Sequence, residues 1–265
     1  NTTAAGNTAV GSRSLTTNTT GATNAGLGKD TLAANTTGAS NTAVGASALA
    51  SNTTAANNTA VGKSALLLNT TGQYNTAVGA NAGDAITTGN SNTMLGFNSG
   101  GATTTAGQNV ALGQSSLTTN TTGSFNTAIG AEALLANTTA ANNTAVGYLA
   151  LTANTTGTHN TAVGAGALDA STTGHDLTAV GYNVLTTNTT GYSNVGVGGG
   201  ASYAAAALQN NTTGYGNSAL GSGALASNIA GVGNCAVGRQ SMYVSTSGSN
   251  NIAMGDQSLD ANTSG

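Results

Sequence analysis

The chain has 265 residues, of which 4% are charged and 3% aromatic, with no Trp, no Pro and 40 Gly. A formal net charge of −3 without any basic stripe excludes the electrostatic pattern of a nucleic-acid-binding protein. No apolar stretch approaches the roughly 18 residues of a membrane-spanning helix, and a single cysteine excludes an intrachain disulfide framework. So few large apolar groups would be typical of disorder if the sequence were not strictly periodic.

One five-residue unit, Asn-Thr-Ala-Val-Gly, recurs along the chain from its first copy at residues 7–11. Related units begin every 17 residues as far as Asn194 and then, after one step of 23, at Asn217, Asn234 and Asn251. Fifteen copies of a short fixed period are typical of a solenoid, in which each copy is one coil. No helical apolar periodicity persists. We predict an all-β parallel β-solenoid (β-roll) of about fifteen 17-residue coils, one repeat domain over residues 1–265 that is a piece of a longer fibre.

Coil positions are numbered from the opening Asn, which is replaced only by Leu177. Position 4 is aliphatic or Met, position 5 is always Gly, position 9 is usually Leu, and position 12 commonly opens Asn-Thr-Thr-Gly. Thr and Val before a Gly predict a short strand and a turn, and Leu predicts a second extended piece at positions 7–10. Asn-Thr-Thr-Gly predicts the return turn, with its Gly at positive φ. Coils stacked about 4.8 Å apart would place Val on Val, Leu on Leu and Asn on Asn in an amide ladder.

Alternation along a strand places positions 2 and 4 on one face and position 3 on the other. We expect Val at position 4 and Leu at position 9 to line the interior of the coil. The Ala column at position 3 would then face outward and pack smoothly against identical chains. All eleven charged residues fall at positions 6, 7, 10 or 17, which are the expected outward turns. One coil buries little, so stability would come from length and from self-association.

Two irregularities interrupt the pattern. The long step contains a six-residue insertion within residues 198–214, which we interpret as a bulge in a solenoid loop, with a receptor-contact loop as the alternative. In the coils that start at Asn75 and Asn92, the Leu at position 9 is replaced by Gly83 and Gly100.

Residues 41–72, which read NTAVGASALASNTTAANNTAVGKSALLLNTTG, resemble repeats of phage tail-fibre and bacterial surface-fibre proteins. They are also similar to the YadA-like head of trimeric autotransporter adhesins, a left-handed parallel β-roll with a Ser/Thr-Val-Ala-Ile-Gly core. The resemblance covers nearly the whole chain and implies a homotrimer that forms a tight rod. The 17-residue period is longer than is usual in that family, with the excess expected in the Asn-Thr-Thr-Gly turn.

Residues with catalytic or ligand chemistry are few. The two histidines, His159 and His175, lie one coil apart in turns; a metal site with Asp176 is the alternative to solvated turn residues, which we favour because no further strong ligand accompanies them. Cys235 replaces a Thr at position 2 and has no His partner in the repeat, so a packed side chain is expected rather than a nucleophile. The glycines follow the period and no phosphate-binding motif occurs. We therefore expect no catalytic, cofactor-binding or metal-binding residues, and no enzyme.

Asn-X-Thr/Ser sequons recur at position 12, in a turn that we expect to be exposed. If the chain passes through a glycosylating pathway they are candidate N-glycosylation sites, although Asn-Thr-Thr-Gly is also good turn chemistry in its own right. The sequon asparagines are Asn18, Asn35, Asn52, Asn69, Asn120, Asn137, Asn154, Asn188, Asn211 and Asn262.

The repeat favours a structural function: an extracellular, cell-surface or virion fibre shaft that projects a binding or adhesion tip. Its partners would be copies of itself, as a homotrimer, and a host-surface glycan or receptor, with no nucleic acid and no membrane span. An ice-binding β-solenoid is the alternative, because Thr recurs at position 2; against it, the Val column on the same face should turn inward. A glycosylated environmental surface filament is a third hypothesis. A β-helix polysaccharide lyase lacks the acids and bases it would need in an aromatic-lined groove.

Overall fold

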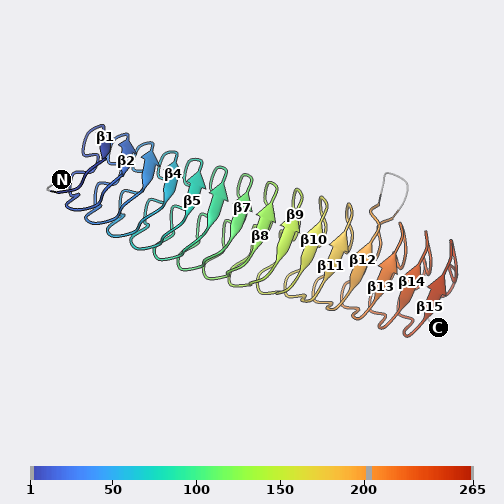
Figure 1. Cartoon of the computed structure of the whole chain (residues 1–265). Helices are drawn as coiled ribbons and strands as arrows, with labels where there is room; N and C mark the ends of the chain where they lie inside the picture. Colours follow the sequence, from blue (N-terminus) through green and yellow to red (C-terminus); the bar gives the residue numbers. More distant parts are fainter. Residues whose placement is uncertain (1–2, 201–204, 264–265) are drawn as a thin grey trace. The chain divides into compact units, whose positions relative to one another are not determined.

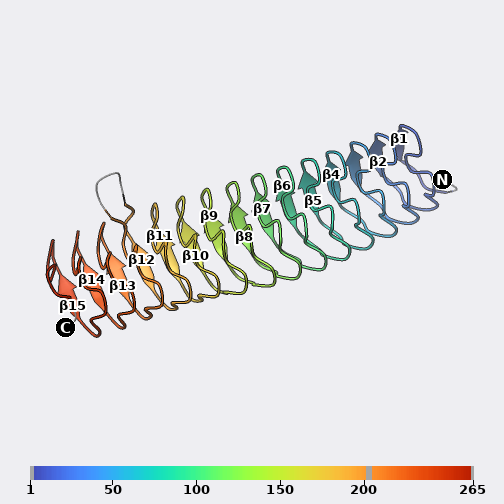
Figure 2. The same cartoon turned by 180° about the vertical axis from the view of Figure 1, so that it is seen from behind.

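The computed structural model describes residues 3–200 and 205–263, which belong to two compact units, residues 1–131 and 132–265. Each unit is a parallel β-solenoid in which every coil contributes one strand of three residues. Figure 1 shows the succession of coils, and Figure 2 shows them from behind. The predicted solenoid of 17-residue coils is therefore confirmed. The first unit contains β1 (Thr8–Val10), β2 (Ala25–Leu27), β3 (Thr42–Val44), β4 (Thr59–Val61), β5 (Thr76–Val78), β6 (Thr93–Leu95), β7 (Val110–Leu112) and β8 (Thr127–Ile129). The second contains β9 (Thr144–Val146), β10 (Thr161–Val163), β11 (Thr178–Val180), β12 (Val195–Val197), β13 (Ser218–Leu220), β14 (Cys235–Val237) and β15 (Ile252–Met254).

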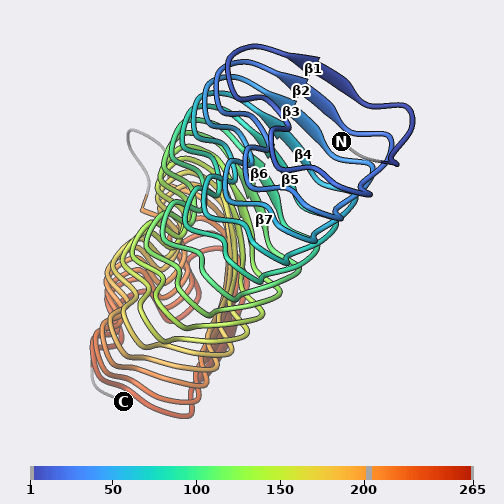
Figure 3. The same cartoon turned by 90° about the vertical axis from the view of Figure 1, so that its left-hand side faces the viewer.

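Within each unit, neighbouring strands pair in parallel and in chain order, so that each coil position meets its own equivalent. Thr42 of β3 pairs with Thr59 of β4, and Val44 pairs with Val61. The end-on view in Figure 3 shows the coils of β1 to β7 stacked in this way. Each residue type in the repeat therefore forms a column, which is why a 17-residue period can specify the whole fold.

The strand ends at a glycine that no other residue replaces. In the coil that starts at Asn41, Gly45 has φ of 119°, and all fifteen glycines at position 5 lie between 119° and 144°. A Cβ on Gly45 would lie 2.6 Å from the carbonyl oxygen of Gly62 in the next coil. Both the conformation and the close approach of the two backbones require glycine here.

The prediction of a second extended piece at positions 7–10 is wrong, because these residues form turns. In the same coil Ser47 and Leu49 both adopt left-handed conformations, with φ of 61° and 51°. This conformation costs an L-residue about 1–2 kcal/mol. Leu49 is nevertheless fully buried, and its backbone N–H donates to the carbonyl of Ala65 in the next coil at 3.0 Å. Burial and coil-to-coil bonding thus stabilise a bend that strand propensity does not reveal.

The predicted orientation of the strand is also wrong: Ala at position 3 points inward and Val at position 4 points outward. Ala43 is fully buried, whereas Val44 is only partly covered, and Val163 and Val180 are each 37% exposed. The cause is the asparagine at position 1. Asn41 is fully buried, and alternation places position 3 on the same face as position 1. The interior is consequently narrow and is filled by Ala at positions 3 and 8 and Leu at position 9.

The coil with the insertion keeps this arrangement. The backbone N–H of Ala207 donates to the carbonyl of Gly198 at 2.9 Å, which closes the base of the inserted segment. Strand β12 still pairs residue for residue with β13, as in Val195 with Ser218. Residues 201–204 of the insertion lie outside the described residues. Extra chain at this place therefore leaves the stacking of the strands unchanged.

Candidate functional site

Two buried asparagine columns, the first interrupted by Leu177, fix the orientation of the strands. At position 1, the backbone N–H of Asn41 donates to Oδ1 of Asn24 at 2.9 Å, and its Nδ2 donates to the carbonyl of Ala55 at 2.8 Å. The first bond joins consecutive coils. The second joins position 1 to position 15 of the same coil, and so closes the coil on itself.

The second column stands at position 12. Nδ2 of Asn52 donates to Oδ1 of Asn35 in the previous coil at 2.7 Å and to the carbonyl of Ala55 at 3.1 Å. The predicted amide ladder is confirmed and is doubled, since both columns converge on the position-15 carbonyl. The glycine common at position 15, such as Gly21, does not have the positive φ expected of it; it gives room to this junction, because a Cβ on Gly21 would lie 2.6 Å from Oδ1 of Asn18.

The expectation that the sequon asparagines are exposed is wrong for nine of the ten. Their side chains are at most 2% exposed, because they form the second ladder. Only Asn262, in the last coil, is partly exposed. Glycosylation itself stays a prediction, which the burial of the acceptor amides now opposes. The nine buried residues are Asn18, Asn35, Asn52, Asn69, Asn120, Asn137, Asn154, Asn188 and Asn211.

With the ladders inside, the side chains at positions 2 and 4 form an outward surface, which we call the outward strand face. Position 4 supplies apolar side chains that remain exposed, such as Val10 at 53% and Leu220 at 52%. No charged residue occurs at either position. Position 2 supplies a threonine column consisting of Thr8, Thr42, Thr59, Thr76, Thr93, Thr127, Thr144, Thr161 and Thr178.

The chemistry of the outward strand face changes towards the end of the chain. From β12 onward, position 2 holds Val195, Ser218, Cys235 and Ile252 instead of Thr. Cys235 is a free thiol that is partly exposed. Here the face becomes more apolar, and in the last coil Ile252 is 71% exposed. Of these residues, only Cys235 was singled out from the sequence, and their apolar neighbours at position 4 were placed inside the coil.

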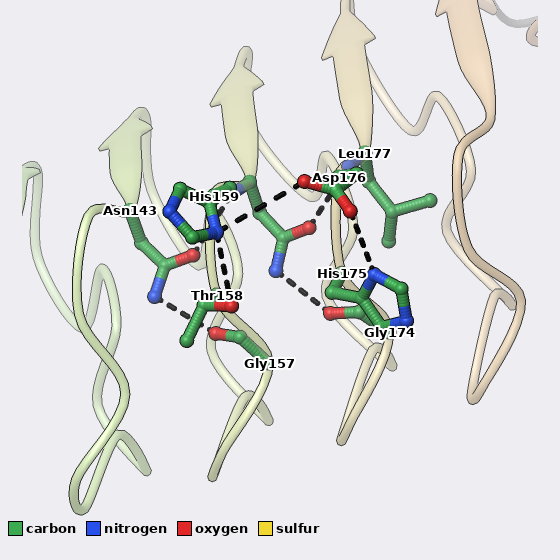
Figure 4. Close-up of polar contacts among 9 residues, drawn as sticks. Asn143, Gly157, Thr158, His159, Gly174, His175, Asp176 and Leu177 are labelled. Atoms are coloured by element: carbon green, nitrogen blue, oxygen red, sulfur yellow. Dashed lines mark hydrogen bonds and ion pairs between the residues drawn. The ribbon is translucent and has the colours of Figure 1, made fainter.

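The two histidines do come together around one carboxylate, as Figure 4 shows. Nδ1 of His175 lies 2.8 Å from Oδ2 of Asp176, and Nδ1 of His159 lies 4.0 Å from Oδ1. All three side chains are about half exposed, and Nδ1 of His159 also lies 3.1 Å from Oγ1 of Thr158. Among the described residues, no group of three His, Cys, Asp or Glu is placed to hold a metal ion. The geometry is that of solvated polar contacts within one turn and with the adjacent turn, which contribute little stability.

A ring column beside this cluster was missed from the sequence. His175 stacks on Tyr192 with ring centroids 5.1 Å apart, and Tyr192 stacks on Tyr215 at 4.6 Å. All three stand two residues before the opening residue of the next coil, so comparing that place from coil to coil was the signal that would have found them. Because the rings cover one another's faces, the column adds stacking to the solenoid and presents ring edges to solvent.

The described residues contain no cavity that would hold a small molecule and no helix of the length and hydropathy needed to cross a membrane. Comparison of the chain with protein-family models, curated proteins and solved structures finds no match. The outward strand face is therefore the candidate site, as a surface rather than a pocket.

Proposed function

We propose that the chain is a structural shaft segment of an extracellular, cell-surface or virion fibre, and that copies of it pack together through the outward strand face. The observation that carries the proposal is the outward column of Val, Leu, Ile and Met at position 4, which recurs in every coil with no charged residue at position 2 or 4. The interior of each coil is complete without these residues. Their repetition therefore calls for a partner that is equally long and equally regular.

A second copy of the chain is such a partner. Covering a Val or Leu side chain contributes roughly 1.5–3 kcal/mol, so even partial cover over many coils gives a large sum. The resemblance to YadA-like heads favours three copies. A shaft of this kind would project an adhesion tip towards a host-surface glycan or receptor, and it requires no catalytic group.

The test is the oligomeric state of the chain and its dependence on this face. Val61→Glu with Val78→Glu would place two charges on the outward strand face. The matched control is Thr54→Glu with Thr71→Glu, which adds the same charges at exposed position 14. Light scattering should give an oligomer for the wild type and the control, and a monomer for the Val variant. A wild-type monomer at every concentration would refute the proposal.

Ice binding is the second candidate, and one observation now favours it. The argument against it required Val to turn inward, but Thr at position 2 and Val at position 4 share the outward face. Flat columns of Thr methyl and hydroxyl groups at coil spacing would then be available to ordered water. Thermal hysteresis from a monomer, abolished by Thr59→Tyr and Thr76→Tyr, would support this function; an oligomer without hysteresis would remove it.

A further inference from the structure

Two positions that are exposed or partly exposed flank every strand. We call the residue just before the opening Asn the entry flank and the residue just after the position-5 Gly the exit flank. For β5 the entry flank is Tyr74 and the exit flank is Ala80; the Tyr74 side chain is 61% exposed. Neither position takes part in the coil interior or in the asparagine ladders.

In the six coils that carry a ring at one flank, the residue at the other flank is small or short. Wherever the entry flank carries a ring, the exit flank of that coil is alanine: Tyr74 with Ala80, Phe125 with Ala131, and His159 with Ala165. Wherever the exit flank carries a ring, the entry flank is a small or short polar residue: Phe97 with Ser91, Tyr148 with Asn142, and Tyr182 with Asp176. Phe97, Phe125, Tyr148 and Tyr182 are all more than half exposed. No coil carries a ring at both flanks.

Contact within one chain does not explain this relation. Six residues separate the flanks of one coil, which at about 3.3 Å per strand residue is a separation of roughly 15–20 Å. A tyrosine ring at one flank cannot reach the other. The two flanks meet only if the entry flank of one copy lies against the exit flank of another.

We infer that copies of the chain associate head-to-tail around a common axis, meaning that the entry flank of one copy lies against the exit flank of the next. Equivalent coils stand at the same level, so that each ring at a flank packs over the small flank residue of the neighbouring copy. This inference rests on the proposed self-association and adds its geometry. Such a contact joins two different edges of the outward strand face, and contacts of this kind close into rings when the rotation between copies allows it. A face-to-face dimer with its two-fold axis along the coil stack also places entry flank against exit flank, whereas antiparallel copies would bring like flanks together, ring against ring.

The coil of β11 fits the same arrangement through chemistry instead of size. Its flanks are Asp176 and Tyr182. At a head-to-tail contact the carboxylate of Asp176 would meet the hydroxyl of Tyr182 in the neighbouring copy, and a phenol O–H donates well to a carboxylate. Contact between like flanks would instead place Asp176 against the same carboxylate of the other copy, which is unfavourable.

Disulfide trapping tests the geometry in a Cys235→Ser background. Ser40 and Ala46 are the exposed flanks of the β3 coil. The double variant Ser40→Cys/Ala46→Cys should form covalent closed oligomers on mild oxidation, whereas each single variant should stay uncrosslinked. The off-level control, Ser40→Cys/Lys63→Cys, moves the exit flank by one coil and should also stay uncrosslinked.

The outcomes separate this inference from the proposed function. Crosslinking by either single variant would show like flanks in contact, and crosslinking by the off-level pair alone would show a one-coil offset; each overturns the inference. An oligomer by light scattering in which no pair crosslinks also overturns it but leaves the shaft proposal standing. A monomer by light scattering refutes both.

A size exchange gives a second measurement. Ala80→Trp should weaken association at least about tenfold, because it meets the Tyr74 ring of the neighbouring copy. Adding Tyr74→Ala should restore association to within about threefold of the wild type. In thermal unfolding of the dissociated chain the two changes should be independent, since they lie too far apart to touch. Additive effects on association would overturn the inference.

Discussion

The thioether of Met94 occupies the space that a side chain at Gly100 would need: a Cβ on Gly100 would lie 2.5 Å from Sδ of Met94. Gly100 replaces the Leu of other coils and keeps its left-handed backbone, with φ of 62°. Met94 in turn replaces the Ala of position 3. The two exchanges conserve interior volume, so we predict strong coupling between them.

Gly100→Leu alone should destabilise the chain by about 1–3 kcal/mol through overpacking. Met94→Ala alone should cost about 2–5 kcal/mol by leaving a cavity. The double variant restores the residues of the common repeat, and its loss of stability should be clearly smaller than the sum of the two single losses. Denaturant unfolding of the four proteins measures this, and additive losses would contradict the volume exchange.

The second asparagine ladder is interrupted where position 12 is not Asn. At such a place, Oδ1 of the asparagine in the preceding coil lacks the Nδ2 donor that the ladder supplies elsewhere. Oδ1 of Asn228, facing Ser245, has no hydrogen-bond partner although it is buried. Ser245→Asn should supply the missing Nδ2 and raise the free energy of unfolding by about 1 kcal/mol. Ile86→Asn is a matched variant that should not raise the free energy of unfolding. It offers the same Nδ2 donor to Asn69, but it removes an apolar side chain whose Cδ1 lies 3.0 Å from the Cβ position of Gly83. Equal effects of the two variants would show that the ladder does not govern stability.

Glycine at position 5 should be irreplaceable within a coil. Gly62 has φ of 137°, and an added Cβ would lie 2.6 Å from the carbonyl carbon of Gly79. Gly62→Ala should cost at least about 1–3 kcal/mol from backbone strain alone. Gly72→Ala is the control for close packing without backbone strain: an added Cβ there would lie 2.5 Å from Oδ1 of Asn69, but the φ of Gly72 is not positive and Ala55 already stands at the equivalent position of another coil. A smaller loss for Gly62→Ala than for Gly72→Ala in thermal unfolding would disprove this explanation.

Folded native material should carry no N-glycan at the nine buried sequons, since a glycosylated amide cannot enter the ladder. Intact-mass measurement should therefore give the bare chain mass, apart from any addition at Asn262 or at the four further Asn-X-Thr triplets, which begin at Asn1, Asn57, Asn142 and Asn210. For material made in a glycosylating host, Thr54→Ala removes the sequon of Asn52 while leaving its amide in place, and this change should improve folding. Hexose additions at Asn52 in folded protein would contradict the burial argument.

Asp84 should make stability depend on pH. Burial raises the pKa of Asp84 above its ordinary value of 3.8, partly offset by backbone hydrogen bonds that lower it. The folded state therefore holds this proton more tightly than the unfolded state. The contribution of Asp84 to the free energy of unfolding is most favourable below its pKa in the unfolded state. This contribution decreases as the pH rises through the higher pKa of the folded state. Asp84→Asn should remove that decrease. The slope of the free energy of unfolding against pH, measured between about pH 3 and 6, should therefore differ between the variant and the wild type. An unchanged slope would contradict this prediction.

The period of the sequence was enough to predict the solenoid, its parallel strands and the stacking of asparagines. It was not enough to orient the strand. Ala43 and Val44 are both small and apolar, so hydrophobicity alone assigns the larger residue to the interior. The deciding residue was Asn41, whose burial forces position 3 inward; treating its ladder as an interior feature would have reversed the prediction.

The residues of the candidate site could be predicted from the sequence, but their arrangement in space could not. The Thr and Val columns could be read directly, but their outward direction followed only from the ladders. The bends at Ser47 and Leu49 could not be read at all, because nothing in a Leu side chain signals a left-handed backbone. The column of His175, Tyr192 and Tyr215 required comparing one position across coils, a step that composition and motif searches omit.

The hydrogen bond from the opening asparagine that closes a coil leaves the length of the segment between strand and second ladder free to vary. In the coil of β12 the closing donor Asn194 reaches Gly214, twenty residues on, yet the bond is 2.7 Å long, as in unexpanded coils. The same asparagine still accepts from the backbone of Asn217 at 2.9 Å. The segment between the strand and the second ladder is thus a natural grafting point. Foreign peptides spliced there, one per coil, would be displayed as an array whose spacing the scaffold sets.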